Sequence, residues 1–264
     1  MTVRVTVAQL VVSDDAAANR EVAGGAFREA AAKKSDLLIL PEYSSAYDSH
    51  GVGPEHAEPL DGPFVTALRR RAADTGIAVI AGTTLPAGDR ASNALVVVDG
   101  AGDLAGVYRK VHLYDAFGTR ESDRLEPGPS EAEPVTLRVG DLTFGVLTCY
   151  DLRFPESARR VVDAGADVLV YPAAWMAGPL KADHWRTLLR ARAIENTAIV
   201  IGVGMAGASV TGRSLLAGPD GVVGLELGEG PEIRTADLDA AGIATARETN
   251  PSLANRRYAV TPRP

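Results

Sequence analysis

The sequence of 264 residues predicts an α/β fold with four layers in the order α-β-β-α. Short apolar runs alternate with stretches of helical period, which is typical of parallel strands joined by right-handed helical crossovers. This β-α-β-α-β order occurs twice, and each half ends in a hairpin pattern. If the helices of each half cover one face of its sheet, the remaining faces have to be buried, and packing the two sheets together achieves this. The pattern alone also allows one doubly wound sheet.

The first half contains five predicted strands and two predicted helices. Strands are expected near residues 3–10, 37–40, 77–82, 95–98 and 106–108, and helices near 16–34 and 63–73. Pro63 stands where a proline starts a helix, because its missing N–H has no partner there in any case. Gly76 stands where a glycine ends one.

The second half repeats this order. We expect strands at residues 142–147, 168–171 and 198–203, with helices at 155–164 and 184–195 between them and a hairpin around 218–221. The segment richest in proline and glycine, residues 126–134, is short and lies in the middle of the chain. A linker is therefore not expected, and the chain is predicted to be a single domain over residues 1–264.

Composition narrows the classes of function. The chain has 27 basic and 34 acidic residues, a net charge of −7, which argues against a nucleic-acid partner because phosphate binding depends on clustered Lys and Arg. No apolar run approaches the roughly 18 residues of a membrane span, and the start of the chain lacks the pattern of a signal peptide. We therefore expect a cytoplasmic protein without a membrane partner. The single cysteine, Cys149, excludes an internal disulfide.

Three ionisable residues follow predicted strands: Glu42, Lys110 and Cys149. Each alone has an ordinary structural explanation, as a loop carboxylate, a surface lysine or a core thiol. Together they complement one another chemically. A thiol is mostly protonated at neutral pH, so a nucleophilic cysteine needs a cation, a base, or both. Glu42 would be the base, and Lys110 would stabilise negative charge on the thiol or on the oxyanion of a tetrahedral intermediate.

Other chemical signals are weak. The segment 202–207 matches the spacing of a dinucleotide-binding loop, but a strand pattern rather than a helix follows it. The four histidines lack the spacing of metal ligands, and no Gly-x-Ser-x-Gly elbow is present. We therefore expect neither a metal site nor a bound dinucleotide.

The three candidate residues lie in segments that resemble the signatures of the nitrilase superfamily of carbon-nitrogen hydrolases. These are Leu40-Pro41-Glu42, Tyr108-Arg109-Lys110-Val111-His112-Leu113 and Cys149-Tyr150-Asp151-Leu152-Arg153-Phe154-Pro155-Glu156. Segments 172–175, 190–196 and 212–214 also resemble that family in the same order, so the likeness covers nearly the whole chain. It implies the four-layer fold, a Glu42-Lys110-Cys149 triad, no cofactor, and self-association as a homodimer or a higher homo-oligomer. It also implies a second glutamate in the site, for which Glu121 fits.

Within the superfamily the chain looks most like the branch of omega-amidases and deaminated-glutathione amidases. That likeness implies a small amide substrate with a free carboxylate and the release of ammonia. Arg153 would bind the carboxylate, or would instead brace its turn through Asp151 or Glu156. The expected walls of the pocket are Tyr47, Tyr150 and Trp175.

Three alternatives remain open at this point. The same triad would serve an N-carbamoyl compound or a nitrile, and a non-catalytic binding module could keep the fold. The segment 202–207 departs from the branch, which commonly has an asparagine after the preceding strand. The loop between Lys110 and Glu121 is also shorter than in many relatives. Both changes put the identity of the substrate in doubt.

Overall fold

The computed structural model describes residues 2–263, so the first and last residues of the expected 1–264 domain lie outside the described residues. The first of two six-stranded sheets has the strand order β14-β1-β2-β3-β4-β5. Its strands are β1 (Thr2–Gln9), β2 (Leu37–Ile39), β3 (Ala78–Ala87), β4 (Arg90–Val98), β5 (Leu104–Arg109) and β14 (Glu232–Asp239). β1, β2 and β3 are parallel, as their helical crossovers predict, and the other pairs are antiparallel.

The second sheet has the order β13-β12-β11-β10-β9-β8. Its strands are β8 (Thr136–Val139), β9 (Leu142–Val146), β10 (Val168–Ala173), β11 (Ile199–Gly204), β12 (Leu215–Ala217) and β13 (Val223–Glu226). Again the three central strands, β9, β10 and β11, are parallel. The antiparallel β12–β13 pair is the hairpin expected around residues 218–221.

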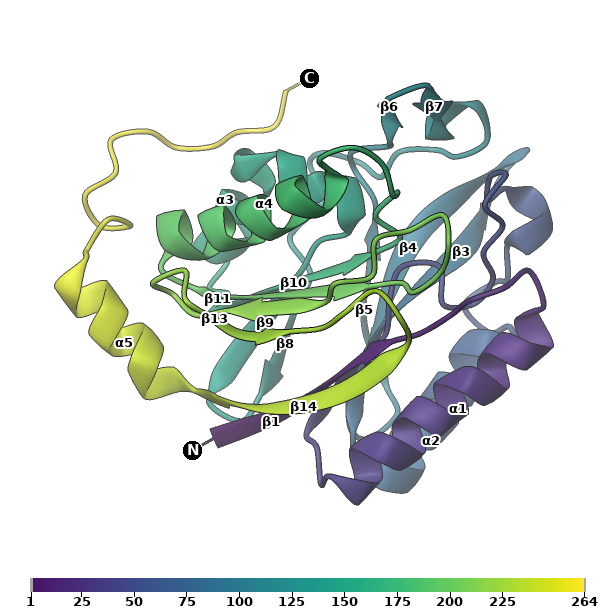
Figure 1. Ribbon diagram of the computed structural model, residues 1–264, viewed down its shortest axis with the longest axis horizontal. Helices are drawn as coiled ribbons and strands as arrows, with labels where there is room; N and C mark the ends of the chain where they lie inside the picture. Colours follow the sequence, from purple (N-terminus) through teal and green to yellow (C-terminus); the bar gives the residue numbers. More distant parts are fainter. Residues whose placement is uncertain (1, 264) are drawn as a thin grey trace.

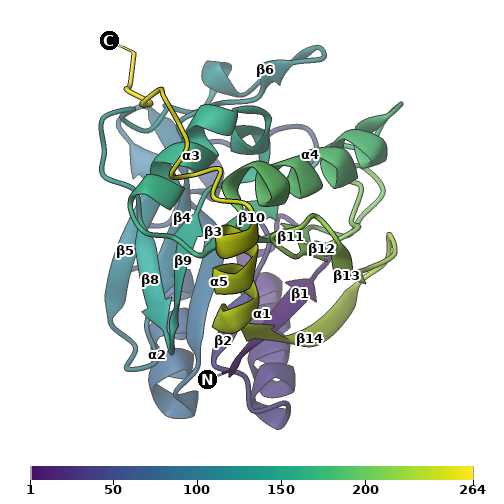
Figure 2. The same cartoon turned by 90° about the vertical axis from the view of Figure 1, so that its left-hand side faces the viewer.

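The helices form the two outer layers. α1 (Ala16–Ala32) and α2 (Pro63–Thr75) cover the first sheet, and α3 (Pro155–Asp163) and α4 (Lys181–Asn196) cover the second, on the opposite side of the molecule (Figures 1 and 2). Between the sheets lies one apolar cluster to which both contribute, including Ile39 and Ile80 from the first and Phe144, Val170 and Ile201 from the second. The predicted α-β-β-α sandwich is confirmed, and burial of the two inner faces explains why the sheets pack together.

The predicted helix ends are confirmed for α2. Pro63 opens it, and Gly76 ends it with a left-handed φ of 73°, a conformation that glycine adopts without the penalty of a Cβ atom. Other boundaries differ. α4 begins at Lys181, three residues before the expected start, and β8 and β14 were not predicted. β14 is a half-buried edge strand, so its sequence lacks a clear apolar alternation.

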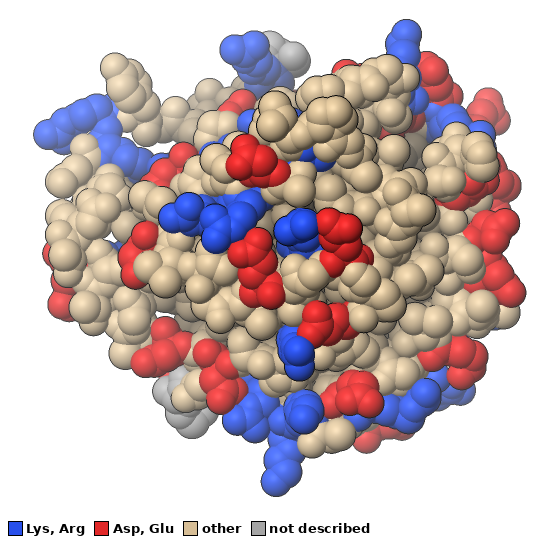
Figure 3. All heavy atoms as spheres, in the orientation of Figure 1, with Lys and Arg blue, Asp and Glu red and all other residues tan. Residues whose placement is uncertain are grey.

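Smaller elements complete the chain. The hairpin of β6 (Asp115–Ala116) and β7 (Thr119–Arg120) projects from the body of the molecule (Figures 1 and 2). Short 3-10 helices span Pro54–His56, Glu121–Asp123 and Cys149–Arg153, and α5 (Ala240–Thr249) is followed by an extended C-terminal segment. On the face drawn in Figure 3, basic and acidic side chains are interspersed. Among the described residues, no helix combines the length and apolar character that a bilayer span requires.

Candidate active site

A cavity of about 400 Å³ lies where chain segments leave both sheets, and its walls include Glu42, Glu121 and Cys149. Glu42 follows β2, and Cys149 opens the 3-10 helix after β9. Lys110 directly follows β5, is only 1% exposed, and contacts both glutamates of the cavity wall through its ammonium. The fold thus brings together four residues that are far apart in the sequence.

The ammonium of Lys110 joins the two glutamates. Its Nζ lies 3.0 Å from Oε1 of Glu42 and 2.9 Å from Oε2 of Glu121. Burial alone would lower the pKa of Lys110, but the charges of Glu121 and Glu42 outweigh it and hold that pKa well above its ordinary value. Lys110 is therefore a permanent cation in this site.

Glu42 is fixed by donors from both sheets. The side-chain Nδ2 of Asn93 on β4 donates to Oε1 at 2.6 Å, and the backbone N–H of Ala174, just after β10, donates to Oε2 at 2.7 Å. Gly82 on β3 allows this approach, because a Cβ there would lie 2.5 Å from the Cα of Glu42. Asn93 was not predicted from the sequence, because it lies in the polar start of β4, before the apolar run 95–98 that marks the strand.

The second glutamate has a similar set of contacts. Besides the lysine ammonium, Glu121 accepts hydrogen bonds from the hydroxyl of Tyr43 at 3.0 Å and from the backbone N–H of Tyr114 at 2.7 Å. Both carboxylate oxygens are therefore engaged by protein donors. This arrangement holds Glu121 against the ammonium of Lys110.

Cys149 has a strained backbone, with φ at 44°, and its side chain is 7% exposed. Burial raises the pKa of its thiol well above the ordinary value, the charge of Glu42 raises it further, and Lys110 opposes both. Of the two ways to activate the thiol that the sequence left open, the structure favours removal of its proton by a base.

Asp151, two residues after the cysteine, fixes this turn. It is fully buried and accepts from the backbone N–H of Thr148 at 3.0 Å and from the hydroxyl of Tyr108 at 2.7 Å. Its other oxygen lies 2.8 Å from Nδ1 of His112 and accepts the backbone N–H of the same residue. The ring of His112 stacks on Phe154. One carboxylate thus connects the segment after Lys110 to the segment around Cys149.

The predicted pocket walls divide into two groups. Tyr47, Tyr150 and Trp175 line the cavity. Arg153 is not among the lining residues. Its guanidinium lies over the ring of Trp175 at 4.8 Å and over that of Phe117 at 5.4 Å, and no ion pair with Asp151 or Glu156 forms within residues 2–263. The alternative in which Arg153 braces its turn through these carboxylates is therefore not what the structure shows.

A second cation, Lys181, lines the cavity and was missed by sequence analysis. It is the first residue of α4, and its ammonium donates to the hydroxyl of Tyr114 at 2.5 Å. The expected start of this helix at residue 184 left Lys181 in the preceding loop, where a lysine is usually exposed, so its burial could not be predicted from the sequence.

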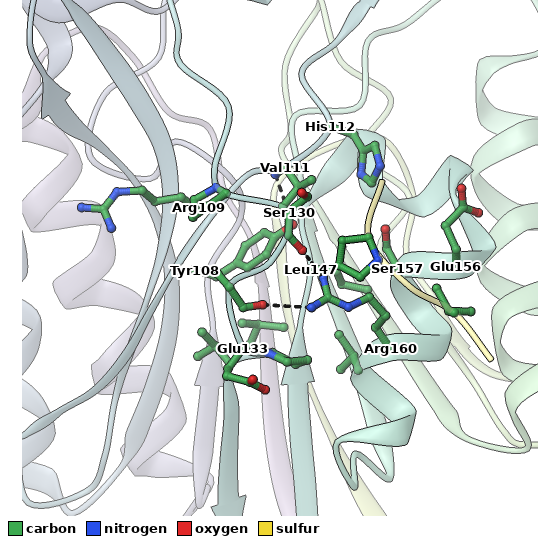
Figure 4. Close-up of a pocket in the computed structure, with 18 of the residues that line it drawn as sticks. Tyr108, Arg109, Val111, His112, Ser130, Glu133, Leu147, Glu156, Ser157 and Arg160 are labelled. Atoms are coloured by element: carbon green, nitrogen blue, oxygen red, sulfur yellow. Dashed lines mark hydrogen bonds between the residues drawn. The ribbon is translucent and has the colours of Figure 1, made fainter. Parts of the chain in front are cut away.

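Another cavity, of about 520 Å³, is lined by residues of β5, the segment 129–135, the end of β9, α3 and the C-terminal segment 259–263 (Figure 4). Arg160 donates to the backbone carbonyl of Ser130 at one side of it. None of Glu42, Lys110 and Cys149 lines this cavity, so the reactive groups belong to the smaller one. Tyr108 and His112, which contact Asp151, line the larger cavity.

Within the described part of the chain, no cluster of three or more His, Cys, Asp or Glu side chains is arranged to hold a metal ion. The chemistry that these residues offer is instead that of a thiol beside a carboxylate and a fixed ammonium. Such a set can form and hydrolyse an acyl-thiol bond.

Comparison with known proteins identifies the family of this chain. The carbon-nitrogen hydrolase family matches residues 4–248. The chain is 38% identical to a deaminated glutathione amidase of Escherichia coli O157:H7 over 244 residues, which cover 91% of this chain and 92% of the relative. It is 31% identical to the human deaminated glutathione amidase, over 96% of this chain and 82% of that one.

Solved structures show the same fold. A carbon-nitrogen hydrolase superfamily protein of Xanthomonas campestris, with an arsenic adduct in its active site, aligns with a TM-score of 0.88 and 29% identity, over 99% of this chain and all of that one. A glutamate-to-glutamine mutant of an amidase from Nesterenkonia sp. AN1 aligns with a TM-score of 0.81 and 26% identity, over 97% and 94% of the two chains. From the sequence motifs, the four-layer fold and these matches, we conclude that the chain belongs to the carbon-nitrogen hydrolase family and is a hydrolase.

Proposed function

We propose that this protein hydrolyses a small carboxylate-bearing amide to the acid and ammonia, through a thioester on Cys149. The observation that carries the proposal is the convergence of Glu42, Cys149 and Glu121 on one cavity, with Lys110 bound to both glutamates. No cofactor takes part in the steps below.

In the first step Glu42 removes the thiol proton of Cys149 as its sulfur attacks the amide carbon. Oε1 of Glu42 already accepts two hydrogen bonds, whereas Oε2 accepts one, from Ala174, and so keeps a lone pair for this proton. The ammonium of Lys110 and the backbone N–H of Tyr150 stabilise the oxyanion. The carbon–nitrogen bond then breaks, and Glu42 returns the proton to the departing ammonia.

The second step uses the same groups. Glu42 removes a proton from water, which attacks the thioester carbon, and the carbon–sulfur bond breaks. The thiolate that leaves takes up the proton, so the site returns to its starting state. One amide and one water give one acid and one ammonia.

Glu121 acts in both steps as a positioning residue. Its oxygens are engaged by Lys110, Tyr43 and Tyr114, so it holds the lysine ammonium toward the oxyanion and has little capacity left for the substrate. Replacement of Glu121 by Gln should lower kcat and leave KM nearly unchanged. Full turnover by that variant would contradict the assignment.

Two kinds of relative support the proposal. The curated relatives in Escherichia coli and human are named deaminated glutathione amidases, which supports an amide substrate with a carboxylate. In the Nesterenkonia amidase mutant, the acetamide moiety of fluoroacetamide is covalently added at the active-site cysteine, which supports a nucleophilic role for Cys149.

The test is ammonia release from alpha-ketoglutaramate, deaminated glutathione, glutamine, a simple aliphatic amide and a nitrile, with Cys149→Ala as the control. An intact-mass measurement after rapid acid quench should show an acyl adduct on the wild type alone, and Cys149 is the only cysteine that could carry it. Turnover that persists in Cys149→Ala would refute the mechanism. Turnover of N-carbamoyl compounds or nitriles alone would show that one of these, rather than an amide, is the substrate class. The absence of turnover with every compound would favour a binding module.

We also expect a cytoplasmic protein that self-associates as a homodimer or a higher homo-oligomer. Light scattering at micromolar concentration should give the mass of a dimer or of a larger assembly, and the mass of a monomer would contradict this expectation.

A further inference from the structure

Lys181 is a buried cation without a carboxylate partner. Lys181 is only 6% exposed and lines the same cavity as Cys149. Its ammonium donates a hydrogen bond to the neutral hydroxyl of Tyr114. Among residues 2–263 no Asp or Glu lies within ion-pair distance of its ammonium. Lysine is rarely buried unless it is paired, so this position calls for an explanation.

Every other charged side chain that lines the cavity contacts an oppositely charged group or a histidine. Glu42 and Glu121 share the ammonium of Lys110, and the remaining pairs are Asp48 with His50, Arg120 with Asp123, and Arg124 with Glu55. Lys181 is the exception within the described wall. The unpaired charge therefore belongs to one identifiable part of the cavity.

Three features of the surroundings penalise this charge. Burial removes water from the ammonium, and this is the main cause that lowers the pKa of Lys181. The positive charge of the nearby Arg153 guanidinium lowers that pKa further. Lys181 also begins α4, a helix of 16 residues, and a cation at a helix N-terminus opposes the helix dipole. An anion beside Lys181 would relieve all three penalties at once.

Aromatic rings enclose the ammonium. It lies 3.5 Å from the centre of the Phe117 ring and 4.9 Å from that of Tyr114. Phe117 stands between β6 and β7 and is 67% exposed, so it covers the ammonium from the solvent side. Tyr114 connects this corner to the catalytic groups, because its backbone N–H donates to Glu121 and its hydroxyl accepts from Lys181.

We propose that Lys181 determines specificity by pairing its ammonium with the free carboxylate of the substrate, under the cover of Phe117. This inference rests on the proposed amide hydrolysis and assigns the recognition of the carboxylate to Lys181 rather than to Arg153. Arg153 does not line the cavity and supports the same corner from behind Trp175. The hydrocarbon stem of Lys181 and the rings around it keep water from the pair, which strengthens it.

The first experiment compares two amides of equal length. Succinamate carries a carboxylate where butyramide carries a methyl group, so the ratio of their kcat/KM values isolates recognition of the charge. In Lys181→Met we expect a fall of about 10- to 100-fold in that ratio, carried mainly by KM for succinamate, because a charge-assisted hydrogen bond is lost. Lys181→Arg should retain most of the preference. Lys33→Met, at an exposed position after α1, is the matched control and should retain all of it.

The second experiment does not depend on turnover. Iodoacetate and iodoacetamide alkylate the same thiol, and only the first carries a carboxylate, so their rate ratio at Cys149 reports the pull of the site on an anion. We expect Lys181→Met to lower this ratio several-fold and Lys33→Met to leave it unchanged. Because Cys149 is the only cysteine, the mass shift of the intact protein reads its alkylation directly.

The outcomes separate the two proposals. A wild type that hydrolyses both amides without preference, or a Lys181→Met variant that loses both activities equally and keeps its alkylation ratio, would overturn the role of Lys181. A wild type that hydrolyses no amide, with an alkylation ratio that still depends on Lys181, would overturn the proposed function and leave an anion site beside Cys149.

Discussion

Asp151 offers the sharpest test of how the turn around the nucleophile is held. The substitution Asp151→Asn keeps the shape of the side chain and replaces one acceptor oxygen with an NH₂ group. Each carboxylate oxygen accepts one backbone N–H: that of His112 at 3.2 Å on one side, and that of Thr148 at 3.0 Å on the other. Whichever way the amide turns, a buried backbone donor faces another donor.

The magnitude follows from these contacts. The imidazole of His112 and the hydroxyl of Tyr108 can adjust to an amide, by a change of tautomer and by rotation, but a backbone N–H cannot. One buried donor left without an acceptor costs about 1–3 kcal/mol, and the remaining bonds lose the strength that a charged acceptor gives them. We expect Asp151→Asn to lower the free energy of unfolding by roughly 2–4 kcal/mol, out of the about 5–15 kcal/mol that domains typically have.

Catalysis should suffer as well. Loss of the Thr148 contact releases the residue before Cys149, and a displacement of the nucleophile by about 1 Å lowers kcat on the order of 100-fold. Urea unfolding and ammonia release would be measured on Asp151→Asn beside Asp74→Asn, which changes an exposed carboxylate on α2. If the free energy of unfolding of Asp151→Asn stays within about 0.5 kcal/mol of the control, and its kcat within about two-fold, the contacts of Asp151 do not position the thiol.

Three further predictions concern Glu42. Glu42→Gln should lower amide turnover at least about 100-fold, because the base is lost. It should nevertheless speed alkylation of Cys149 by iodoacetamide at neutral pH, because removal of the carboxylate charge lowers the pKa of the thiol. Slower alkylation would show that the charge of Glu42 does not raise this pKa. Asn93→Ala should lower kcat about 10-fold, since one oxygen of Glu42 loses its amide donor, and steady-state kinetics with KM as the internal reference would show it. Gly82→Ala should nearly abolish turnover while circular dichroism stays native-like, because the new Cβ would collide with the backbone of Glu42. An active variant would show that the backbone around Glu42 can shift without loss of function.

The fold was largely predictable because its elements repeat a strong local pattern. Buried parallel strands such as β2 and β10 are short apolar runs, and their helices begin and end at recognisable residues. β14 escaped because an edge strand that is half exposed has no reason to alternate cleanly, and its pairing with β1 joins opposite ends of the chain. Its partner is chosen by tertiary packing, which a local pattern does not record.

The candidate site was predictable only in part, and the missing part has a common cause. Glu42, Lys110, Glu121 and Cys149 lie in or beside recognisable motifs. The groups that orient or complement them act through contacts between distant segments: Asn93 on β4, the backbone of Ala174, and Lys181 at the start of α4. A lysine in a sequence is read as exposed, and its burial becomes visible only when Tyr114 and Phe117 are placed around it.

The division of the site between the two sheets has a consequence for how the protein fails. Glu42 and Lys110 come from the first sheet, Cys149 from the second, and the N–H that holds Glu42 from the end of β10. Each sheet keeps its own hydrogen-bond ladder, whereas the two sheets are held together by their shared apolar cluster, so a small shift of one sheet against the other would displace these groups without breaking any strand pairing. Enzymatic turnover would vanish on such a shift, well ahead of any loss of far-ultraviolet circular dichroism, which makes catalysis the more sensitive gauge of whether the halves are docked.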